Sequence, residues 1–219
     1  QVGTIDGVQT PNNLYWSAVW STQEFYETYD PADLRRDNIA RFKYVYDDNQ
    51  NLVKEDLSSE PIYYAYKFRH ALTEEGRGPG WANWANPINF PIIRYADVLL
   101  MYAEADVRLN KTVSTSAIDC VNQVRHRAGL ADLPAEKTAS VNDFLDALLE
   151  ERGHEFYYEG HRRIDLIRFN KYYTIMDAIG CTPTSQYFPI PNYAVDQATD
   201  MGYTLTQYFT RPDYDGPQR

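Results

Sequence analysis

Long apolar runs, cysteines and positive charges are all scarce in this 219-residue chain. No apolar run approaches the roughly 20 residues that a membrane-spanning helix needs. The opening QVGTIDGVQTPNN has neither the charged nor the apolar region of a signal peptide. The 21 Lys and Arg residues against 31 Asp and Glu give a net charge of -10, which argues against a nucleic-acid ligand. These absences leave either a cytosolic protein or one whose export segment lies outside this chain.

Motifs for metal, redox and nucleotide chemistry are also missing. Cys120 and Cys181 fit no zinc or redox spacing. Cys120 falls on a helical pattern and is expected to be a buried thiol, although a disulfide between the two cysteines stays open. The chain contains no nucleophile motif, phosphate loop or dinucleotide fingerprint, and GRGPG at 76–80 is only a glycine-rich loop.

Aromatic residues are the abundant class. The hydrophobic fraction of 43% and the charged fraction of 24% are ordinary for a globular domain. The aromatic fraction is 15%, with 19 Tyr and 4 Trp, which is more than a core of this size needs. Many of these rings must reach the surface, where a flat ring with a polar tip favours recognition of other molecules.

The first 90 residues are irregular and contain one hairpin pattern. The segment Arg41–Glu55 alternates around the turn-forming DDNQN, which predicts a β-hairpin. Its Asp47, Asn49 and Asn51 begin a calcium-loop pattern, but Leu52 and Ser58 stand where that pattern needs Gly and Glu. We therefore interpret the segment as a turn rather than a metal site.

The rest of the chain is predicted to be mainly helical. A first helix spans Phe90–Asn110, starting near Pro91, with apolar residues at helical spacing: Ile92, Ile93, Ala96, Leu99, Leu100, Ala103 and Val107. A second follows a capping box at Ser116–Asp119 and ends at Gly129. A third begins at a capping box at Ser140 and extends to Gly160, with RRIDLIRF as a candidate continuation. The proline-punctuated tail CTPTSQYFPIPNYAVDQ is expected to be extended.

The stretch EERGHEFYYEGHRRIDLIRF raises the question of metal or acid–base chemistry. His154 and His161 are seven residues apart, about 10.5 Å along a helix, so they cannot share one ion. Glu155 and Glu159 could bracket a cation, but three arginines lie within about a turn of them: Arg152, Arg162 and Arg163. Paired arginines also lower carboxylate pKa values, which removes a general acid. We predict a structural ion-pair network, with Arg94 and Glu104 as candidate partners, and no metal or cofactor.

Several motifs, taken in order, resemble one known family. IIRYADVLLMYAEA, VNQVRHRAGL, EERGHEFYYEGHRRIDLIR, FPIP and LTQ occur in the order seen in the C-terminal half of SusD/RagB proteins. Upstream, YDPADLRRDNI is similar to the segment ahead of the helical part, so the resemblance covers about residues 26–207. Two departures stand out. Gly153 interrupts the motif helix at a cost of about 1 kcal/mol relative to Ala, and Tyr208 follows LTQ where the family usually has Asn.

The resemblance implies a fold and a role. It implies a mainly α fold of tetratricopeptide-like helix pairs, with an irregular, hairpin-containing part that carries the ligand site. The chain would be the C-terminal portion of such a protein, with an irregular region at 1–90, a helical scaffold at 91–170 and an extended segment at 171–219. The first helix pairs of the family have no counterpart here. The implied role is capture of an oligosaccharide and delivery to a SusC-like TonB-dependent transporter, without catalysis. The implied location is the outer-membrane surface, through a lipid anchor outside this chain.

Two loops offer the ring and amide side chains that sugar binding uses. Rings stack on the apolar faces of a sugar, while amides and charged groups bond its polar edges. The first loop supplies Asn12, Asn13, Tyr15, Trp16 and Trp20, and the second supplies Trp81, Asn83, Trp84 and Asn86. Any one of these tryptophans could instead plug onto the helices beneath. The tyrosines on the helical patterns are expected to pack or to form a rim: Tyr102, Tyr157, Tyr158, Tyr172 and Tyr173.

Two other classes of function compete with glycan capture. An acidic glycoside hydrolase would use the same tryptophans with a carboxylate pair, and it would release new reducing ends from a glycan. A helical-repeat adaptor that binds another protein would explain the helix pairs but not the Trp- and Asn-rich loops.

Overall fold

A computed structural model describes residues 20–49, 51–68, 90–183 and 185–205. The chain divides into two compact units, residues 1–162 and residues 163–219. The first unit carries a helical scaffold and a strand-containing part, and the second carries short helices. Each unit is described below by itself.

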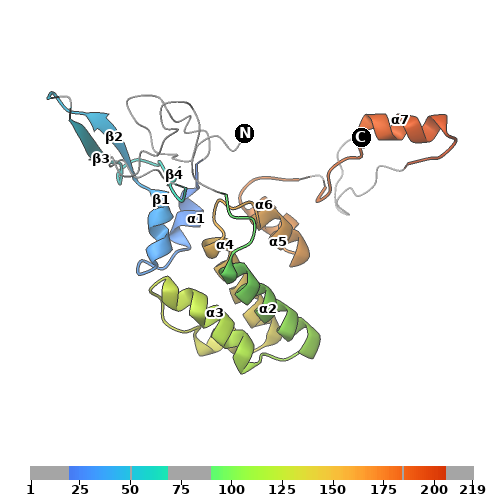
Figure 1. Ribbon diagram of the computed structural model, residues 1–219, viewed down its shortest axis with the longest axis horizontal. Helices are drawn as coiled ribbons and strands as arrows, with labels where there is room; N and C mark the ends of the chain where they lie inside the picture. Colours follow the sequence, from blue (N-terminus) through green and yellow to red (C-terminus); the bar gives the residue numbers. More distant parts are fainter. Residues whose placement is uncertain (1–19, 50, 69–89, 184, 206–219) are drawn as a thin grey trace. The chain divides into compact units, whose positions relative to one another are not determined.

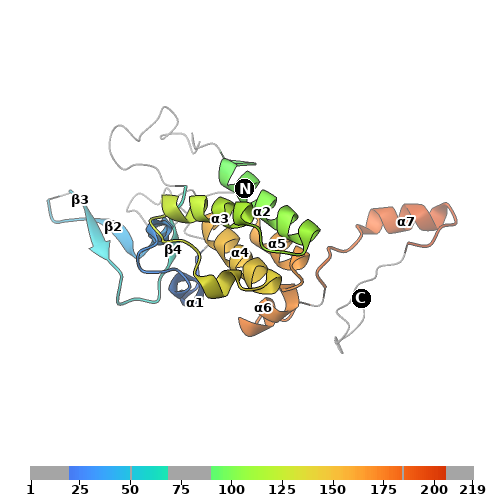
Figure 2. The same cartoon turned by 90° about the horizontal axis from the view of Figure 1, so that it is seen from below.

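Three helices form the scaffold of the first unit. They are α2 (Tyr95–Asn110), α3 (Thr115–Arg127) and α4 (Val141–Glu155), with a short 3₁₀ helix, η4 (Ala135–Thr138), between the last two. Figures 1 and 2 show α2 beside α3, with α4 packed against them. Their shared core includes five fully buried side chains: Leu100, Val107, Val121, Phe144 and Leu148. The prediction of a mainly α fold built on helix pairs is confirmed.

Side-chain caps set where α3 and α4 begin. Ser140 accepts a hydrogen bond from the backbone N–H of Asp143 at 3.1 Å, so this predicted cap is confirmed. The predicted cap at Ser116 is wrong, because Ser114 accepts from the N–H of Ala117 at 3.0 Å and Ser116 lies inside α3. At the other end of α3, Gly129 has φ +82°, the left-handed conformation of a helix C-terminus.

The start of α2 also differs from the prediction. Pro91 does not open the helix, which begins at Tyr95 after Arg94 in an extended conformation (φ -123°, ψ 157°). Ile92 and Ile93 therefore lie outside the helix, and they are 82% and 68% exposed rather than part of the core. The guanidinium of Arg94 pairs with Glu155, the last residue of α4, and with Glu159 in the turn that follows.

α4 ends earlier than its sequence pattern indicates. The predicted extension to Gly160 is wrong, because α4 ends at Glu155 and a turn follows before α5 (Arg162–Arg168). Tyr158 and Gly160 have φ +64° and +83° in that turn. Positive φ at a tyrosine is uncommon and is incompatible with a continuous helix. The break places Glu159 beside the end of α4 rather than one turn further along it.

The strand-containing part precedes the scaffold in the chain. It consists of α1 (Gln23–Glu27), the 3₁₀ helix η1 (Leu34–Asn38), and strands β1 (Ile39–Ala40), β2 (Phe42–Tyr46), β3 (Leu52–Asp56) and β4 (Tyr64–Ala65). β2 and β3 pair antiparallel, which confirms the predicted hairpin, and β1 pairs antiparallel with β4. In the hairpin turn, Asp47 accepts the backbone N–H groups of Asn49 and Asn51 at 2.9 and 2.8 Å, an Asx-type turn.

Two small apolar clusters hold this part together. One is formed by Ala40, Leu57 and Tyr64, with Phe42, Ile62 and Tyr66 against it. The other is formed by Tyr29, Ile39 and Tyr63, with Phe25, Tyr26 and Tyr157 against it. Because Tyr157 follows α4, the second cluster fastens the strand-containing part to the end of the scaffold.

The second unit contains most of α5, α6 (Tyr172–Ala178) and α7 (Asn192–Asp200). The backbone of Gln186 bonds to both α5 and α6. Its N–H donates to Tyr173 Oη at 3.0 Å, and its carbonyl accepts from Arg163 at 2.6 Å. Residues 192–200 form α7 after Pro191, where the sequence pattern predicts an extended segment. Cys181 lies exposed in this unit and Cys120 is half-buried in α3; both are free thiols.

Candidate functional site

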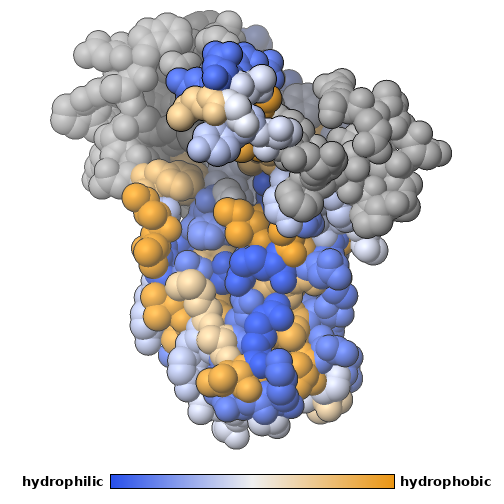
Figure 3. Space-filling model, turned by 90° about the vertical axis from the view of Figure 1, so that its right-hand side faces the viewer, coloured by the Kyte–Doolittle hydropathy of each residue, from blue (hydrophilic) through white to orange (hydrophobic). Residues whose placement is uncertain are grey.

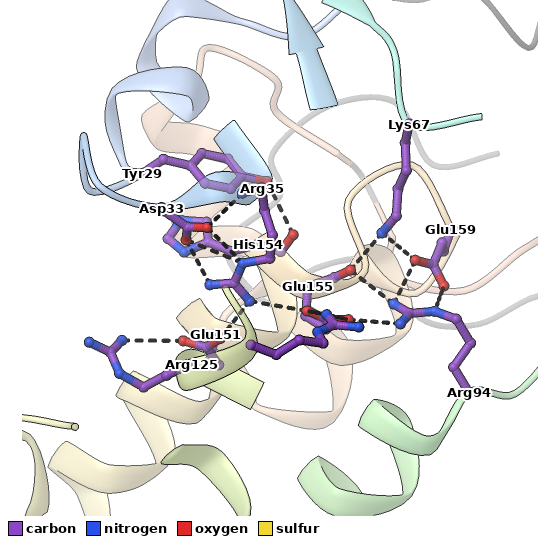
Figure 4. Close-up of polar contacts among 11 residues, drawn as sticks. Tyr29, Asp33, Arg35, Lys67, Arg94, Arg125, Glu151, His154, Glu155 and Glu159 are labelled. Carbon is purple, nitrogen blue, oxygen red and sulfur yellow. Dashed lines mark hydrogen bonds and ion pairs between the residues drawn. The ribbon is translucent and has the colours of Figure 1, made fainter. Parts of the chain in front are cut away.

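A buried network of charges centres on Glu155, at the end of α4 (Figure 4). Its carboxylate accepts hydrogen bonds from three arginines: Arg94 at 2.8 Å, Arg127 at 2.5 and 2.6 Å, and Arg35 at 3.2 Å. These arginines come from the segment before α2, from the last turn of α3 and from η1. Burial would raise the pKa of Glu155, but the bonds from Arg94 and Arg127 outweigh it, so that pKa lies below the ordinary value.

Glu159 extends the network on one side. Arg94 donates to its two oxygens at 2.7 and 2.8 Å, a bidentate pair, and Lys67 forms a further ion pair with it. Lys67 also donates to the carbonyl of Glu155 at 2.6 Å. Burial lowers the pKa of Lys67, and the neighbouring carboxylate of Glu159 opposes that effect. Lys67 follows β4, so this pair ties the strand-containing part to the end of α4.

Glu151 extends the network on the other side, one turn earlier in α4. It accepts from Arg35 at 2.6 Å and from Arg125 at 3.3 Å. Arg35 is also held by Asp33, which accepts from its side chain at 2.7 to 3.2 Å. Burial raises the pKa of Glu151, while Arg35 acts in the opposite direction. Desolvation of this carboxylate is therefore only partly offset by its partners.

Several pairings expected from the sequence take a different form. Arg94 pairs with Glu155 and Glu159, as predicted. Glu104 pairs with Arg108 at 2.8 Å within α2 instead. Arg152, expected beside the glutamates, donates at 2.9 Å to the buried Asp97 of α2. Arg162 and Arg163, also expected to pair with the glutamates, donate to the backbone carbonyls of Leu149 and Gln186.

A polar cleft of about 430 Å³ opens over this network, lined by Arg35, Asn38, Lys67, Arg94, Arg127 and Glu155. The one carboxylate of this lining has a side chain only 1% exposed, and three arginines cover it. A lowered pKa and full hydrogen bonding leave Glu155 without a proton to donate near neutral pH. Among the described residues there is no group of three possible metal-ligating side chains. The arrangement supports a structural role for these charges.

His154 lies next to the network and borders a second cavity of about 400 Å³. Its ring stacks on Tyr29 at 4.1 Å between ring centres, and Tyr29 Oη donates to the His154 carbonyl at 3.2 Å. The Thr28 hydroxyl donates to the Phe25 carbonyl at 2.7 Å, so His154 Nε2, 2.9 Å from that hydroxyl, is the donor to it. Burial, followed by the charge of Arg35, lowers the pKa of His154 to about 4. The imidazole is therefore neutral at pH 7.

Gly153 has a packing role that the sequence pattern does not indicate. A Cβ placed there would lie 2.9 Å from Nη1 of Arg162, the atom that donates to the Leu149 carbonyl at 2.8 Å. The glycine therefore leaves room for the Arg162 guanidinium against α4. Its cost in helix propensity is compensated by this contact.

We expect Gly153→Ala to lower the free energy of unfolding by about 1 kcal/mol. The alanine gains about 1 kcal/mol of helix propensity, but displacing Arg162 forfeits a charged hydrogen bond of about 1.5–3 kcal/mol. Urea denaturation of a double-mutant cycle with Arg162→Met measures the coupling. In the Arg162→Met background the alanine should be neutral or stabilising. Stabilisation by the alanine in both backgrounds would show that the close approach is unimportant.

Among the described residues, one exposed aromatic side chain, Trp20, lies beside β4. Trp20 forms a β-bridge with Tyr64, and its indole packs edge-on against the Tyr64 ring at 6.0 Å. The N–H of Ser21 donates to the Tyr63 carbonyl at 2.8 Å, which fixes the backbone next to Trp20. The indole is 56% exposed. Trp20 is therefore a surface side chain whose backbone pairs with β4, and it is not part of the buried core.

Two arginines contact tyrosine rings near Trp20. Arg41 lies 3.9 Å over the Tyr63 ring and donates to the carbonyls of Leu57, Ser58 and Glu60. Arg36 lies 4.2 Å over the Tyr26 ring. We use the name aromatic platform for Trp20 together with Tyr26, Tyr63 and Tyr64.

Only one of the predicted ligand residues lies in the described part of the chain. Trp20 is placed on the aromatic platform, while the other candidates lie outside the described residues: Asn12, Asn13, Tyr15, Trp16, Trp81, Asn83, Trp84 and Asn86. Tyr157 stacks on Phe25 at 5.4 Å and Tyr172 is buried, in agreement with packing roles. Tyr102, also expected to pack, is 50% exposed.

Fold and site together define a helical scaffold with internal charges and, on its strand-containing part, an exposed Trp20 packed against the buried Tyr64. The sequence model of the SusD family matches residues 8–211. Because that match covers most of the chain, the protein belongs to the SusD family.

Individual relatives agree with this assignment. SusD-like protein P38 of Formosa agariphila is 35% identical over 112 residues, which are 47% of this chain and 21% of that protein. Surface glycan-binding protein A from Bacteroides uniformis has a solved structure with 27% identity and a TM-score of 0.57, and the match covers 84% of this chain and 39% of that one. A laminarin binding SusD-like protein has 25% identity and a TM-score of 0.58, covering 91% and 39%.

The chain therefore spans about a fifth of that curated relative and about two fifths of those solved chains. No helix in the described ranges is both long and apolar enough to cross a membrane.

Proposed function

We propose that this chain is part of a glycan-binding protein that captures oligosaccharides without cleaving them. The observation that carries the proposal is the exposed indole of Trp20 on the aromatic platform. A ring that is half exposed to water suits the apolar face of a sugar. The names of two solved relatives, a surface glycan-binding protein and a laminarin binding protein, support the same ligand class.

Polar groups that could bond the edges of a sugar belong to the same proposal. Asn13, Tyr15 and Trp16 precede Trp20 in the chain, and Trp81, Asn83 and Trp84 form the second candidate loop. We propose that these residues complete the ligand site. Their rings and amides are the kinds of side chain that a sugar site combines.

The hydrolase alternative is less well supported by the geometry. A glycosidase needs one carboxylic acid that keeps its proton and a second carboxylate beside the bond. Glu155 and Glu159 are held by arginines and a lysine, and Glu151 is buried beneath Arg35 and Arg125. The adaptor alternative accounts for the helix pairs but gives no use to an exposed indole.

Family membership supports a cellular role. We propose a cell-surface location at the outer membrane, with a lipid anchor outside this chain, and delivery of the glycan to a SusC-like TonB-dependent transporter. We propose no nucleic-acid partner, because a net charge of -10 disfavours binding to phosphates.

We expect Trp20→Ala to weaken glycan binding roughly tenfold, about 1.4 kcal/mol, because the sugar loses its stacking ring. A glycan array that includes laminarin first identifies a ligand, and calorimetry then compares the affinities. The melting temperature should stay unchanged, since the indole is more than half exposed. Trp16→Ala and Trp81→Ala test the two segments predicted from the sequence in the same way.

Tyr193→Ala is the matched control, because it removes an exposed ring from α7 in the second unit. It should leave affinity unchanged. If Trp20→Ala lowered both the glycan affinity and the melting temperature, the indole would have a structural role instead of a ligand-binding one. New reducing ends after incubation with the bound glycan would favour the hydrolase instead.

A further inference from the structure

The polar cleft over the charge network is lined mainly by cationic side chains, and we call it the cationic cleft. Its volume of about 430 Å³ lies within the usual range of small-molecule sites, about 300–1,000 Å³. Such sites are mostly apolar, and the face of the molecule in Figure 3 shows hydrophobic residues among the hydrophilic ones. The described lining of the cleft has no apolar residue, so it suits a small and strongly polar ligand. Four cations, one amide and one carboxylate make up this lining: Arg35, Lys67, Arg94, Arg127, Asn38 and Glu155.

The cations of the network are more exposed than the carboxylates that hold them. The side chains of Glu155 and Glu159 are only 1% and 2% exposed. Those of Arg127, Arg94 and Lys67 are 58%, 23% and 16% exposed. The cleft therefore presents guanidinium and ammonium groups to solvent, with the negative charges beneath them. Fixed cations on the walls of a cleft concentrate anions there, even in a chain with a net charge of -10.

The network leaves several hydrogen-bond donors of the cleft unused. Arg127 bonds to Glu155 through Nη2 alone, so three of its five N–H groups, on Nε and Nη1, make no bond to the described residues. In the described part of the chain, the side-chain amide of Asn38 also has no partner. Lys67 contacts Glu155 and Glu159, which leaves one of its three N–H groups. An oxyanion could accept hydrogen bonds from all of these groups.

Backbone hydrogen bonds hold these donors next to one another. The carbonyl of Asn38, the last residue of η1, accepts from the N–H of Tyr66 at 2.8 Å, directly before the lysine of the cleft. The N–H of Leu34, the first residue of η1, donates at 3.0 Å to the carbonyl of Ala128, directly after Arg127. The segments that carry the donors are thus fixed before any ligand arrives. A preorganised site loses little free energy to ordering when it binds.

We infer that the cationic cleft binds an oxyanion group, a carboxylate or a sulfate, of a small polar ligand. Arg127 and Asn38 donate to the oxygens of this group, and Lys67 adds an ion pair. An acidic sugar and a free anion share this chemistry, and the titrations below distinguish them. The described lining does not include Trp20, so the inference does not depend on glycan capture at the aromatic platform.

The test is a set of calorimetric titrations of the full chain at constant ionic strength, with glucuronate, acetate and sulfate as probes. Calorimetry is preferred to melting, because sulfate stabilises proteins in general by exclusion from their surface. We expect saturable 1:1 binding of at least one of the three anions. Tighter binding of glucuronate than of acetate would support an acidic sugar as the ligand, whereas equal binding would support a free anion. Glucose is the neutral control for binding at the aromatic platform.

Asn38→Asp is the most informative variant, because it places a carboxylate of the same shape among the cations of the cleft. It should lower the affinity for each bound anion at least tenfold, while any binding of glucose stays unchanged. The melting temperature should rise or stay the same, since the amide gives up no hydrogen bond and the new charge lies near cations. Asn38→Ala adds no charge and provides a second test. It should weaken anion binding severalfold at an unchanged melting temperature.

Asn192→Asp is the matched control, because it makes the same exchange in α7 of the second unit, where the side chain is exposed. It should bind the anions like the unchanged chain. Trp20→Ala should also retain anion binding, so failure of the aromatic platform as a glycan site is distinguishable from failure of this inference.

Two results would overturn the inference. If none of the three anions bound saturably, the carboxylates of the network would be the only anions that these cations hold. If Asn38→Asp and Asn38→Ala bound the anions as tightly as the unchanged chain, the anions would bind elsewhere. Circular dichroism of each variant confirms that the fold is kept.

Discussion

Replacement of Glu155 by glutamine is expected to lower the free energy of unfolding by about 3–5 kcal/mol. The glutamine keeps the shape of the side chain but removes the charge that three arginines share, Arg35, Arg94 and Arg127. Removal of one partner from a buried ion-pair network is the costly case. Arg35 keeps Asp33 and Glu151, and Arg94 keeps Glu159, but all three arginines lose the charge at the centre of the network. A shift of about 2–4 °C per kcal/mol applies to a chain of this size. Urea denaturation and thermal melting followed by circular dichroism measure both effects.

Glu150→Gln is the control for the loss of charge itself. Glu150 lies in the same helix as Glu155 and is exposed. Its carboxylate Oε2 is 3.4 Å from Nζ of Lys137. Surface pairs of this kind contribute at most about 1 kcal/mol, so the control should be close to neutral. A loss below 1 kcal/mol in Glu155→Gln would contradict a structural role. Loss of glycan affinity at unchanged stability would instead place this carboxylate in the ligand site.

The size of the expected effect reflects how many segments meet at one side chain. Arg35 lies in η1, directly before β1, and β1 pairs with β4. β4 in turn carries the bridge to Trp20. A single carboxylate at the end of α4 therefore sets the position of the backbone that presents the indole. The scaffold charges and the aromatic platform differ in chemistry but are connected through η1, β1 and β4.

The helical core could be predicted from the sequence because its signals are local. The apolar spacing of α2, the cap at Ser140 and the Gly129 terminus each lie within a few residues of what they determine. The errors arose where two local signals competed. Ser114 and Ser116 both offer a hydroxyl, and only the backbone path decides which one caps α3. The end of α4 depends on positive φ at Tyr158, which tyrosine rarely adopts.

The partners in the charge network could be predicted only in part. Arg94 was found because it sits on the first strong helical pattern. Arg35 and Lys67 lie in segments without periodicity, and Arg35 is 120 residues away from Glu155 in the chain. A pairing between residues so far apart in the chain produces no recognisable pattern of residue spacing in the sequence. Four glutamates and four arginines within twenty residues suggest pairing within that stretch, and they do not reveal that the glutamates take most of their partners from elsewhere.

The aromatic platform shows a related limit. Composition indicated that rings must reach the surface, and Trp20 does so. Nothing in the sequence showed that Tyr64, 44 residues later, would support it through a strand pairing. Exposure of a ring depends on the packing around it, which is a property of the fold rather than of the local sequence.

Acidification is expected to destabilise the protein through His154. In the folded chain its pKa is lowered to about 4 from a model-peptide value of 6.5. Between pH 6.5 and pH 4 the unfolded chain therefore binds a proton that the folded chain does not, so stability falls as pH falls. The contribution is fully present above pH 6.5. About 2 kcal/mol of it should be lost between pH 7.5 and pH 5. Urea denaturation at the two pH values measures the change.

His154→Gln isolates this contribution, because the glutamine amide can still donate to the Thr28 hydroxyl but cannot take up a proton. The variant should lose less stability than the unchanged chain between pH 7.5 and pH 5, by about 2 kcal/mol. His126→Gln is the control for exchanging a histidine for a glutamine, since His126 is exposed on the surface beside Asp132. Carboxylates with shifted pKa values, such as Glu151 and Glu155, are present in all three proteins, so their contributions cancel in the comparison. An identical pH dependence in His154→Gln and the unchanged chain would show that the imidazole takes up its proton as readily in the fold as in water.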